Sequence, residues 1–260
     1  MACPRYDFHI HTKYLGCAKP EMEVPAILAE CERVGVAALA FTDHLNRPDQ
    51  IGLHAAILAD IKAADCPLDV YFGVELNFMS CDGPLALDQA GRARHGFQFA
   101  IGGVHETYIE SYDLGKMVAI QHRHHLAICA NPLVDVLVHP YWFSPHEFEV
   151  KGFPVFNSMK AVPPSCVREL GQAAAQTRTA IEINADANFV KHMGGGRFAD
   201  EYVGYLAALA EEGPMFSVSS DAHNLADLAN VKESWDVVER LGLGADRIWK
   251  PAGEPVNKRR

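Results

Sequence analysis

The sequence predicts an α/β fold in which helices cover a parallel sheet. Seven short apolar runs are spread over the 260 residues, and segments with helical spacing lie between them. The runs are continuous rather than alternating, as expected of strands that are buried on both faces of a parallel sheet. Hydrophobic residues make up 49% of the chain, which is enough for a sizeable core. These observations leave two architectures open, an α/β barrel and a doubly wound sheet.

Each apolar run has the length of a single strand. The expected strands are Tyr6–Ile10, Val36–Thr42, Leu68–Val74, Phe99–Val104, Leu133–Val138, Ala180–Ile183 and Met215–Ser219. Three stretches between them carry apolar residues at the spacing of a helix that packs on a core. These stripes are Val24, Ile27, Leu28, Cys31 and Val34; Phe198, Tyr202, Tyr205, Leu206 and Leu209; and Leu228, Val231, Trp235, Val238 and Leu241. Gly35 directly follows the first stripe, where a helix commonly ends on a glycine.

The domain organisation is expected to be simple, with one domain over residues 1–250 and a polar tail over residues 251–260. The one long excursion is Tyr141–Pro164, which is rich in aromatic residues and proline. A loop of this length commonly forms a lid or a wall of a substrate pocket. We therefore expect residues 141–164 to be a lid-like insertion.

Several classes of protein are disfavoured by composition. No apolar run approaches the ~20 residues of a membrane-spanning helix, and no signal-length apolar segment begins the chain. The seven cysteines are odd in number and form no CxxC pair, which predicts reduced thiols and a cytoplasmic location. The formal net charge of −10 argues against a nucleic-acid partner, although a small anionic substrate remains compatible with bound metal ions. Nothing in the sequence specifies an oligomeric state.

Polar side chains of the types that bind metal ions or take part in catalysis lie at the ends of the predicted strands. They are His9 and His11, Asp43 and His44, Glu75, His105, His139, Glu182 and Asn184, and Asp221 and His223. In a strand, the two-residue spacing of His9 and His11 places both imidazoles on the same face. In a parallel barrel all strand carboxyl ends meet at one mouth, so these distant residues would converge there.

This convergence predicts a metal centre. Imidazole nitrogens combined with carboxylates suit Zn²⁺, Mn²⁺ or Fe²⁺ better than Ca²⁺ or Mg²⁺, which prefer oxygen ligands. The candidate ligands are His9, His11, His44, Glu75, His105, His139, Asp221 and His223. Because eight ligands exceed the needs of one ion, we expect two or three divalent ions that share a carboxylate.

The same motifs resemble a known family. The segments are His9-Ile10-His11-Thr12, Thr42-Asp43-His44, Gly73-x-Glu75, Val104-His105, Val138-His139-Pro140 and Ser220-Asp221-Ala222-His223. In this order they are similar to the successive motifs of the polymerase-and-histidinol-phosphatase (PHP) family. The resemblance implies a distorted (β/α)7 barrel of the TIM type with a multinuclear metal site at the carboxyl ends of the strands. It also implies that this centre hydrolyses phosphate esters.

The resemblance further implies how the ligands are shared. His9, His11, Glu75 and Asp221 would hold a first ion, Glu75 would bridge to a second ion completed by His105 and His139, and a third would take His44 and His223. Many relatives place one more histidine eight residues after the first of the His-x-His pair, where this chain has Cys17. As a thiolate ligand, Cys17 would complete a third site that favours Zn²⁺ over Mn²⁺. Because small cysteines are commonly buried, we expect instead that Cys17 points into the barrel wall and that the centre is dinuclear.

Four further residues are candidate substrate contacts. Arg197 follows a run of three glycines before a predicted helix, where it and the backbone amides could meet a phosphate unless the run is a plain flexible loop. Asn184 and Trp142 follow predicted strands toward the mouth, and Lys13 lies just beyond the His-x-His pair. By contrast, the histidine-rich segment 121–125 is expected to be a solvent-exposed face of a helix.

The sequence therefore predicts an enzyme, a metal-dependent phosphoesterase that acts on a small phosphorylated molecule. A metal-activated water would attack the phosphorus, and Asp221 or His223 would relay a proton to the leaving alkoxide. Histidinol phosphatase is the named activity that the resemblance suggests. Two other classes stay open: a metallohydrolase of amides or carboxylic esters, and a metal-binding module without catalysis. A nuclease is disfavoured because no basic stripe is evident.

Overall fold

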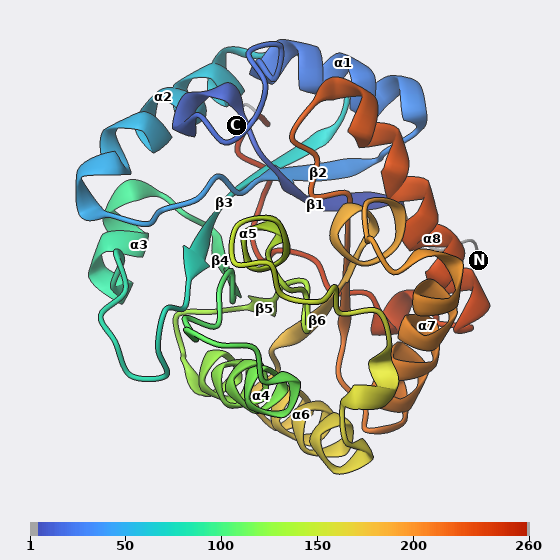
Figure 1. The fold of residues 1–260 in the computed structure, drawn as a ribbon. Helices are drawn as coiled ribbons and strands as arrows, with labels where there is room; N and C mark the ends of the chain where they lie inside the picture. The colour runs from blue at the N-terminus through green and yellow to red at the C-terminus, as the bar shows by residue number, and fades with distance from the viewer. Residues whose placement is uncertain (1–4, 259–260) are drawn as a thin grey trace.

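The chain folds into a barrel of seven parallel strands whose order in space follows their order in sequence. The computed structural model describes residues 5–258. The strands are β1 (Tyr6–Ile10), β2 (Ala38–Phe41), β3 (Asp69–Asn77), β4 (Phe99–Gly103), β5 (Val136–Leu137), β6 (Ala180–Asn184) and β7 (Phe216–Ser219). Figure 1 looks along the barrel and shows the strands surrounded by helices.

The first and last strands close the barrel. Just beyond β7, Ala222 forms a parallel bridge with Ile10 of β1, and the Asp221 amide donates to the His9 carbonyl at 2.9 Å. This closure confirms the predicted TIM-like barrel and excludes the doubly wound sheet. It also brings two candidate motifs, more than 200 residues apart in sequence, into direct backbone contact.

The helices form the outer layer of the barrel. They are α1 (Val24–Val34), α2 (Ile51–Ala63), α3 (Gln89–His95), α4 (Leu114–Ala130), α5 (Pro145–Glu149), α6 (Pro164–Thr177), α7 (Gly195–Glu211) and α8 (Val231–Arg240). Short 3-10 helices are η1 (Lys13–Leu15), η2 (Pro48–Gln50), η3 (Met159–Ala161), η5 (Leu225–Asn230) and η6 (Ala245–Arg247), and η4 (Asp186–Val190) is π-helical. The expected stripes are buried on α1, on α7 and along η5 and α8, except for Leu241, which follows α8 and is partly buried. Gly35 caps α1 in the left-handed conformation, at φ 85°.

The interior of the barrel holds its own apolar cluster, which includes Phe8, Tyr71 and Phe99. Trp249 packs edge-on against Phe8 and Phe99. The register of β1 shifts between Asp7 and Ile10, so that Phe8 belongs to the inner cluster while Ile10 belongs to the outer core beneath the helices. This irregularity turns His9 and His11 toward the interior, above Phe8.

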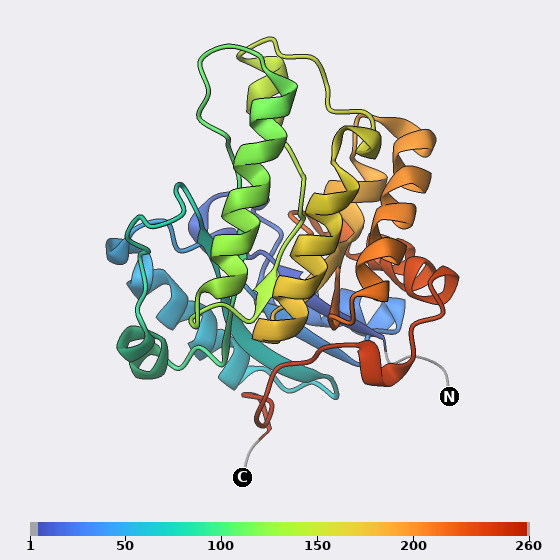
Figure 2. The ribbon, with the colours of Figure 1, turned by 90° about the horizontal axis from the view of Figure 1, so that it is seen from below.

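The expected polar tail lies along the barrel as far as it is described; residues 259–260 lie outside the described part. The Val256 amide donates to the Val70 carbonyl at 2.8 Å, and the Val70 amide donates to the Asn257 side chain at 3.1 Å. In Figure 2 this red C-terminal segment lies at the lower end of the molecule, whereas α5 lies at the upper end. The mouth and this segment are therefore at opposite ends of the barrel.

The segment 141–164 folds as α5, η3 and connecting loops at the mouth end. Tyr141, Phe143 and Phe156 are buried, and Glu147 of α5 accepts a hydrogen bond from the Thr107 amide at 3.0 Å. These contacts fix the segment to the loop that follows β4. Its role as a lid stays a prediction. Among the described residues, no helix is long and apolar enough to cross a membrane.

The histidine-rich segment 121–125 is not a solvent-exposed face, so that expectation is wrong. His122, His124 and His125 are all buried on α4, which packs against α6. His122 contacts the Tyr141 hydroxyl at 3.1 Å and the Glu169 carboxylate at 3.0 Å, and the His125 ring meets Tyr141 edge-on. The sequence suggested exposure because histidines are polar, but aromatic and carboxylate partners from distant segments surround them.

Candidate metal centre

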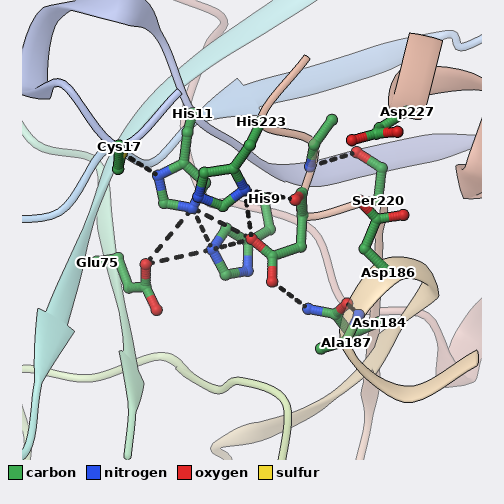
Figure 3. Close-up of polar contacts among 12 residues, drawn as sticks. His9, His11, Cys17, Glu75, Asn184, Asp186, Ala187, Ser220, His223 and Asp227 are labelled. Carbon is green, nitrogen blue, oxygen red and sulfur yellow. Dashed lines mark hydrogen bonds and ion pairs between the residues drawn. The ribbon is translucent and has the colours of Figure 1, made fainter. Parts of the chain in front are cut away.

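Three of the predicted ligands form the first part of a cluster at the mouth. The Nε2 atoms of His9 and His11 are 3.0 Å apart, and Asp221 Oδ1 lies 3.4 Å and 3.2 Å from them. Figure 3 shows the two imidazoles side by side, with His223 against His11. The ring centroids of His11 and His223 are 4.2 Å apart. The His-x-His spacing on β1 and the closure onto β7 together produce this arrangement.

Glu75 lies at the centre of the remaining histidines. Its Oε2 atom is 2.7 Å from His44 Nδ1. Its Oε1 atom is 3.0 Å from His105 Nε2 and 3.3 Å from His139 Nε2. His9 and His11 are also within 3.5 Å of Oε2. The structure thus brings all eight predicted ligands together, and β3 runs past its predicted end so that Glu75 is fixed within a strand.

The donor set fits divalent cations. Three groups of side chains have ligand atoms within 4.8 Å of one another: His9, His11 and Asp221; His44, Glu75 and His105; and His11, Cys17, His44 and His223. The Oε2 atom of Glu75 is buried and makes no hydrogen bond with the described residues, although His44 Nδ1 lies only 2.7 Å from it. A buried carboxylate oxygen surrounded by imidazole nitrogens is a suitable ligand for Zn²⁺, Mn²⁺ or Fe²⁺.

Electrostatics in the cluster favour a cation between these groups. Burial alone would raise the pKa of Glu75, but the neighbouring histidines, with His44 first, hold it well below its usual range. Burial alone would lower the pKa of His9, but the carboxylates of Asp221, Glu182 and Glu75 raise it well above its usual range. Burial lowers the pKa of His11 strongly, which keeps that imidazole neutral as a ligand must be.

Glu182, which is among the polar residues at the strand ends but is not one of the eight predicted ligands, is a further functional candidate. This buried carboxylate accepts from His9 Nδ1 at 2.7 Å and from Ser219 Oγ at 2.6 Å through Oε1. Its Oε2 atom accepts from the His139 amide at 2.7 Å and from Asn184 Nδ2 at 3.0 Å. A carboxylate in a buried strand, two residues before an asparagine directed at the mouth, was the available signal. Glu182 thus orients one predicted ligand through its ring and another through its backbone.

Two predicted ligands sit on backbone that is rarely adopted by non-glycine residues. The φ angles are 31° at His139 and 61° at Asp221, and Tyr141 has a φ of 58°. The turn after β5 is held by hydrogen bonds from the Tyr202 hydroxyl to the Pro140 carbonyl and from Gln121 to the Trp142 carbonyl, both 2.8 Å. Such strained conformations persist only where surrounding contacts fix them, and they concentrate at functional sites.

Cys17 does not point into the barrel wall, so that expectation is wrong. The residue is exposed, and its sulfur lies 3.9 Å from His11 Nδ1. Gly16 ends η1 in the left-handed conformation, and the Lys19 amide donates to the His223 carbonyl at 2.8 Å. This turn brings Cys17 over the mouth, beside His11 and His223 (Figure 3). The ligand atoms of Cys17, His11, His44 and His223 all lie within 4.8 Å of one another.

The four predicted substrate contacts divide into two pairs. Asn184 donates to Asp221 Oδ2 at 3.1 Å, and the Trp142 ring centroid is 5.3 Å from that of His139. The other pair, Arg197 and Lys13, does not lie at the cluster. Arg197 has a side chain that is 71% exposed and faces Glu201, and Lys13 pairs with Glu23 at 2.6 Å.

A cavity of about 180 Å³ adjoins the cluster. It is lined by Trp142, Pro145, Asp186, Ala187, Lys191, Asp221 and His223. Lys191 was not expected at the mouth, because the loop after β6 gives no sequence signal for its path. A larger cavity of about 540 Å³ lies between α6 and α7, but none of its lining residues belongs to the metal cluster. The smaller cavity is therefore the one placed to hold a reacting molecule.

Comparisons with known proteins agree with this geometry. A family model described as PHP domain matches residues 7–185. A probable phosphatase of Enterobacter sp. (strain 638) is 24% identical over 246 residues, covering 93% of this chain and 88% of the relative. A probable phosphatase of Tolumonas auensis is 23% identical over 249 residues, covering 94% and 89%.

Two solved structures share the fold. Histidinol phosphate phosphatase from Lactococcus lactis subsp. lactis Il1403, in complex with zinc, L-histidinol and phosphate, has a TM-score of 0.65 and 16% identity, with 98% of each chain covered. The putative histidinol phosphatase from Listeria monocytogenes has a TM-score of 0.63 and 11% identity, covering 86% of this chain and 97% of that one. At these identities the likeness concerns the architecture of the barrel.

Proposed function

The chain belongs to the PHP domain family and is a metal-dependent phosphoesterase, and we propose that its substrate is the phosphate monoester of a small molecule. The observation that carries this proposal is the position of Glu75, whose carboxylate lies within 3.5 Å of five imidazoles. The adjoining cavity of about 180 Å³ suits a small leaving group rather than a polymer. The net charge of −10 supports the same choice against nucleic acid.

The metal ligands in this proposal are the eight predicted residues together with Cys17. They are His9, His11, Cys17, His44, Glu75, His105, His139, Asp221 and His223. When bound there, divalent ions would lower the pKa of water toward neutrality and neutralise charge on the phosphoryl group. Among the described residues, no serine or lysine side chain forms a hydrogen bond or ion pair with these nine ligands, so water is the proposed nucleophile.

Asp221 and His223 are the proposed proton-relay residues, and both line the cavity. The His223 Nδ1 atom donates to the Asp221 carbonyl at 2.9 Å, so Nε2 is the ring nitrogen left to bind an ion or exchange a proton. When His223 binds a metal ion, Asp221 is the residue proposed to transfer the proton. Asn184 fixes the second Asp221 oxygen by a hydrogen bond of 3.1 Å. Proton delivery to the leaving oxygen is the expected role of this pair.

Histidinol phosphate is one candidate substrate, since the zinc-containing Lactococcus lactis structure holds L-histidinol and phosphate. An amide or carboxylic-ester hydrolase and a metal-binding module remain the alternatives that a substrate panel must separate. The cytoplasmic location stays a prediction of the cysteine pattern. Zinc, manganese and iron are the ions to compare.

A substrate panel tests the proposed function. We expect the protein to release phosphate from small monoesters when Mn²⁺ or Zn²⁺ is present, and to lose this activity after exhaustive chelation. The panel includes histidinol phosphate, a phosphodiester, an amide, a carboxylic ester and a labelled single-stranded oligonucleotide. Cleavage of the amide or ester without phosphate release would contradict the proposal. Tight metal binding without hydrolysis of any compound would favour the non-catalytic module.

The number of ions is tested at Cys17. Because its sulfur lies beside His11 with His44 and His223 close by, we propose three ions rather than two. Cys17→Ser should lower the metal content from three ions per chain to two. Co²⁺-loaded protein should show a thiolate-to-metal absorption band that the variant lacks. Two ions in both proteins, with no such band, would contradict the third site and show that the centre is dinuclear.

A further inference from the structure

Lys191 places an ammonium group beside the metal cluster. It directly follows the π-helical turn η4 after β6 and lines the cavity that Asp221 and His223 also line. Its side chain is 46% exposed. Among the residues that line this cavity it is the only lysine or arginine. Arg197 and Lys13, the two cations that the sequence predicts as substrate contacts, pair instead with Glu201 and Glu23.

The Lys191 ammonium is held in place by two carboxylates. Asp186 Oδ2 lies 2.5 Å from Nζ, and Asp227 pairs with the same nitrogen. Asp186 is in turn fixed by Asn230 at 2.6 Å, and Asp227 by Asn224. An ammonium has three N–H donors, so two are used and one is left for a ligand. This anchoring lowers the entropy that the side chain would lose on binding.

The position of Lys191 indicates which part of a substrate it meets. The phosphoryl end of a monoester belongs at the metal ligands, as proposed above, so the cavity receives the leaving group. Trp142, Pro145 and Ala187 give this cavity an apolar wall, while Lys191 and Asp186 give it a polar one. Figure 3 shows Asp186 and Ala187 on the far side of His223 from Glu75. Burial raises the pKa of Asp186 to about 7, so near neutral pH this carboxyl group is partly protonated and Lys191 faces less than two full negative charges.

We propose that Lys191 is the specificity-determining residue for the leaving group and that it donates a hydrogen bond to a hydroxyl or carboxylate oxygen there. The preferred substrates are then phosphorylated small alcohols that carry an additional oxygen acceptor. This inference rests on the proposed phosphomonoesterase function. It assigns substrate selection to the residue that directly follows η4 and that pairs with Asp186 and Asp227 rather than with a proposed metal ligand.

Three probes with the same phosphate and a different leaving group test this assignment. Propyl phosphate offers no acceptor, glycerol 1-phosphate offers hydroxyls, and 3-phosphoglycerate adds a carboxylate. Lys191→Gln should raise KM for 3-phosphoglycerate about tenfold, as expected for loss of a charged hydrogen bond. KM for propyl phosphate and the zinc affinity should stay unchanged. Lys191→Arg keeps the charge and should keep most of the preference.

Lys258→Gln is the matched control, because Lys258 is 45% exposed and pairs with Asp69 at 3.1 Å on the far end of the barrel. It should change none of the three KM values. Equal KM values for wild type and Lys191→Gln in an active enzyme would overturn the inference. A parallel rise in KM for propyl phosphate and in Ki for inorganic phosphate would also overturn it, by making Lys191 a phosphate contact. A wild-type protein that hydrolyses no monoester would instead remove the proposed function, a result that the wild-type data alone distinguish.

Discussion

Replacing Glu75 by glutamine should abolish both metal binding and turnover. This carboxylate lies 2.7 Å from His44, 3.0 Å from His105 and 3.3 Å from His139, so one side chain joins three of the proposed ligands. Removing one partner of a buried charge network lowers the free energy of unfolding by about 3–5 kcal/mol. Because turnover in the proposed mechanism depends on the bound ions, we expect kcat/KM to fall by at least about a thousandfold, which corresponds to about 4 kcal/mol of transition-state stabilisation. Metal content should fall in the same preparation.

The readout that separates ligation from a folding defect is the melting temperature with and without zinc. Wild type should be stabilised by zinc, because an ion that binds only the folded state shifts the unfolding equilibrium. Glu75→Gln should lose most of this shift. Asp135→Asn is the control, since Asp135 accepts from the Ala100 amide at 2.9 Å at the opposite end of the barrel and should keep the zinc effect. Wild-type turnover in Glu75→Gln would rule out the proposed mechanism.

Glu182→Gln should weaken zinc binding and lower kcat by up to about 100-fold. Both oxygens of this carboxylate accept two hydrogen bonds, from His9 and Ser219 on one side and from His139 and Asn184 on the other. An amide presents N–H donors in place of one of these oxygens, so either orientation opposes two existing donors. The imidazole of His9 or the backbone of His139 must then shift. Isothermal titration with zinc and steady-state kinetics measure the two effects.

Glu147→Gln is the matched control for Glu182. Both hydrogen bonds to Glu147 come from Thr107 and reach the same oxygen, Oε1, while Oε2 has no partner among the described residues. A glutamine can keep Oε1 as the acceptor, so zinc affinity should be unchanged. Equal zinc affinity and kcat for Glu182→Gln and wild type would show that Glu182 serves folding alone.

Much of the site was predictable because its signals are local. The continuous apolar runs of a parallel sheet and the polar residues at their ends can be read within a few residues of each other. His9 and His11 share a face because the strand period is two, and the α1 helix ends at Gly35 because glycine tolerates positive φ. The sequence by itself therefore determined the seven strands, three of the helices, the eight candidate ligands and, through the order of the motifs, the family.

The tertiary structure decided everything that depends on contacts between distant segments. Closure of β1 onto the end of β7 made the sheet a barrel, and the turn at Gly16 brought Cys17 to the mouth instead of the wall. On α4, the buried His122 contacts Tyr141 and Glu169, and no pattern in the neighbouring sequence predicts these contacts. The same holds for Lys191, which replaces Arg197 and Lys13 as the cation beside the cluster because η4 turns the chain toward Asp221. Side-chain burial and pairing are properties of the assembled fold, whereas periodicity is a property of the chain.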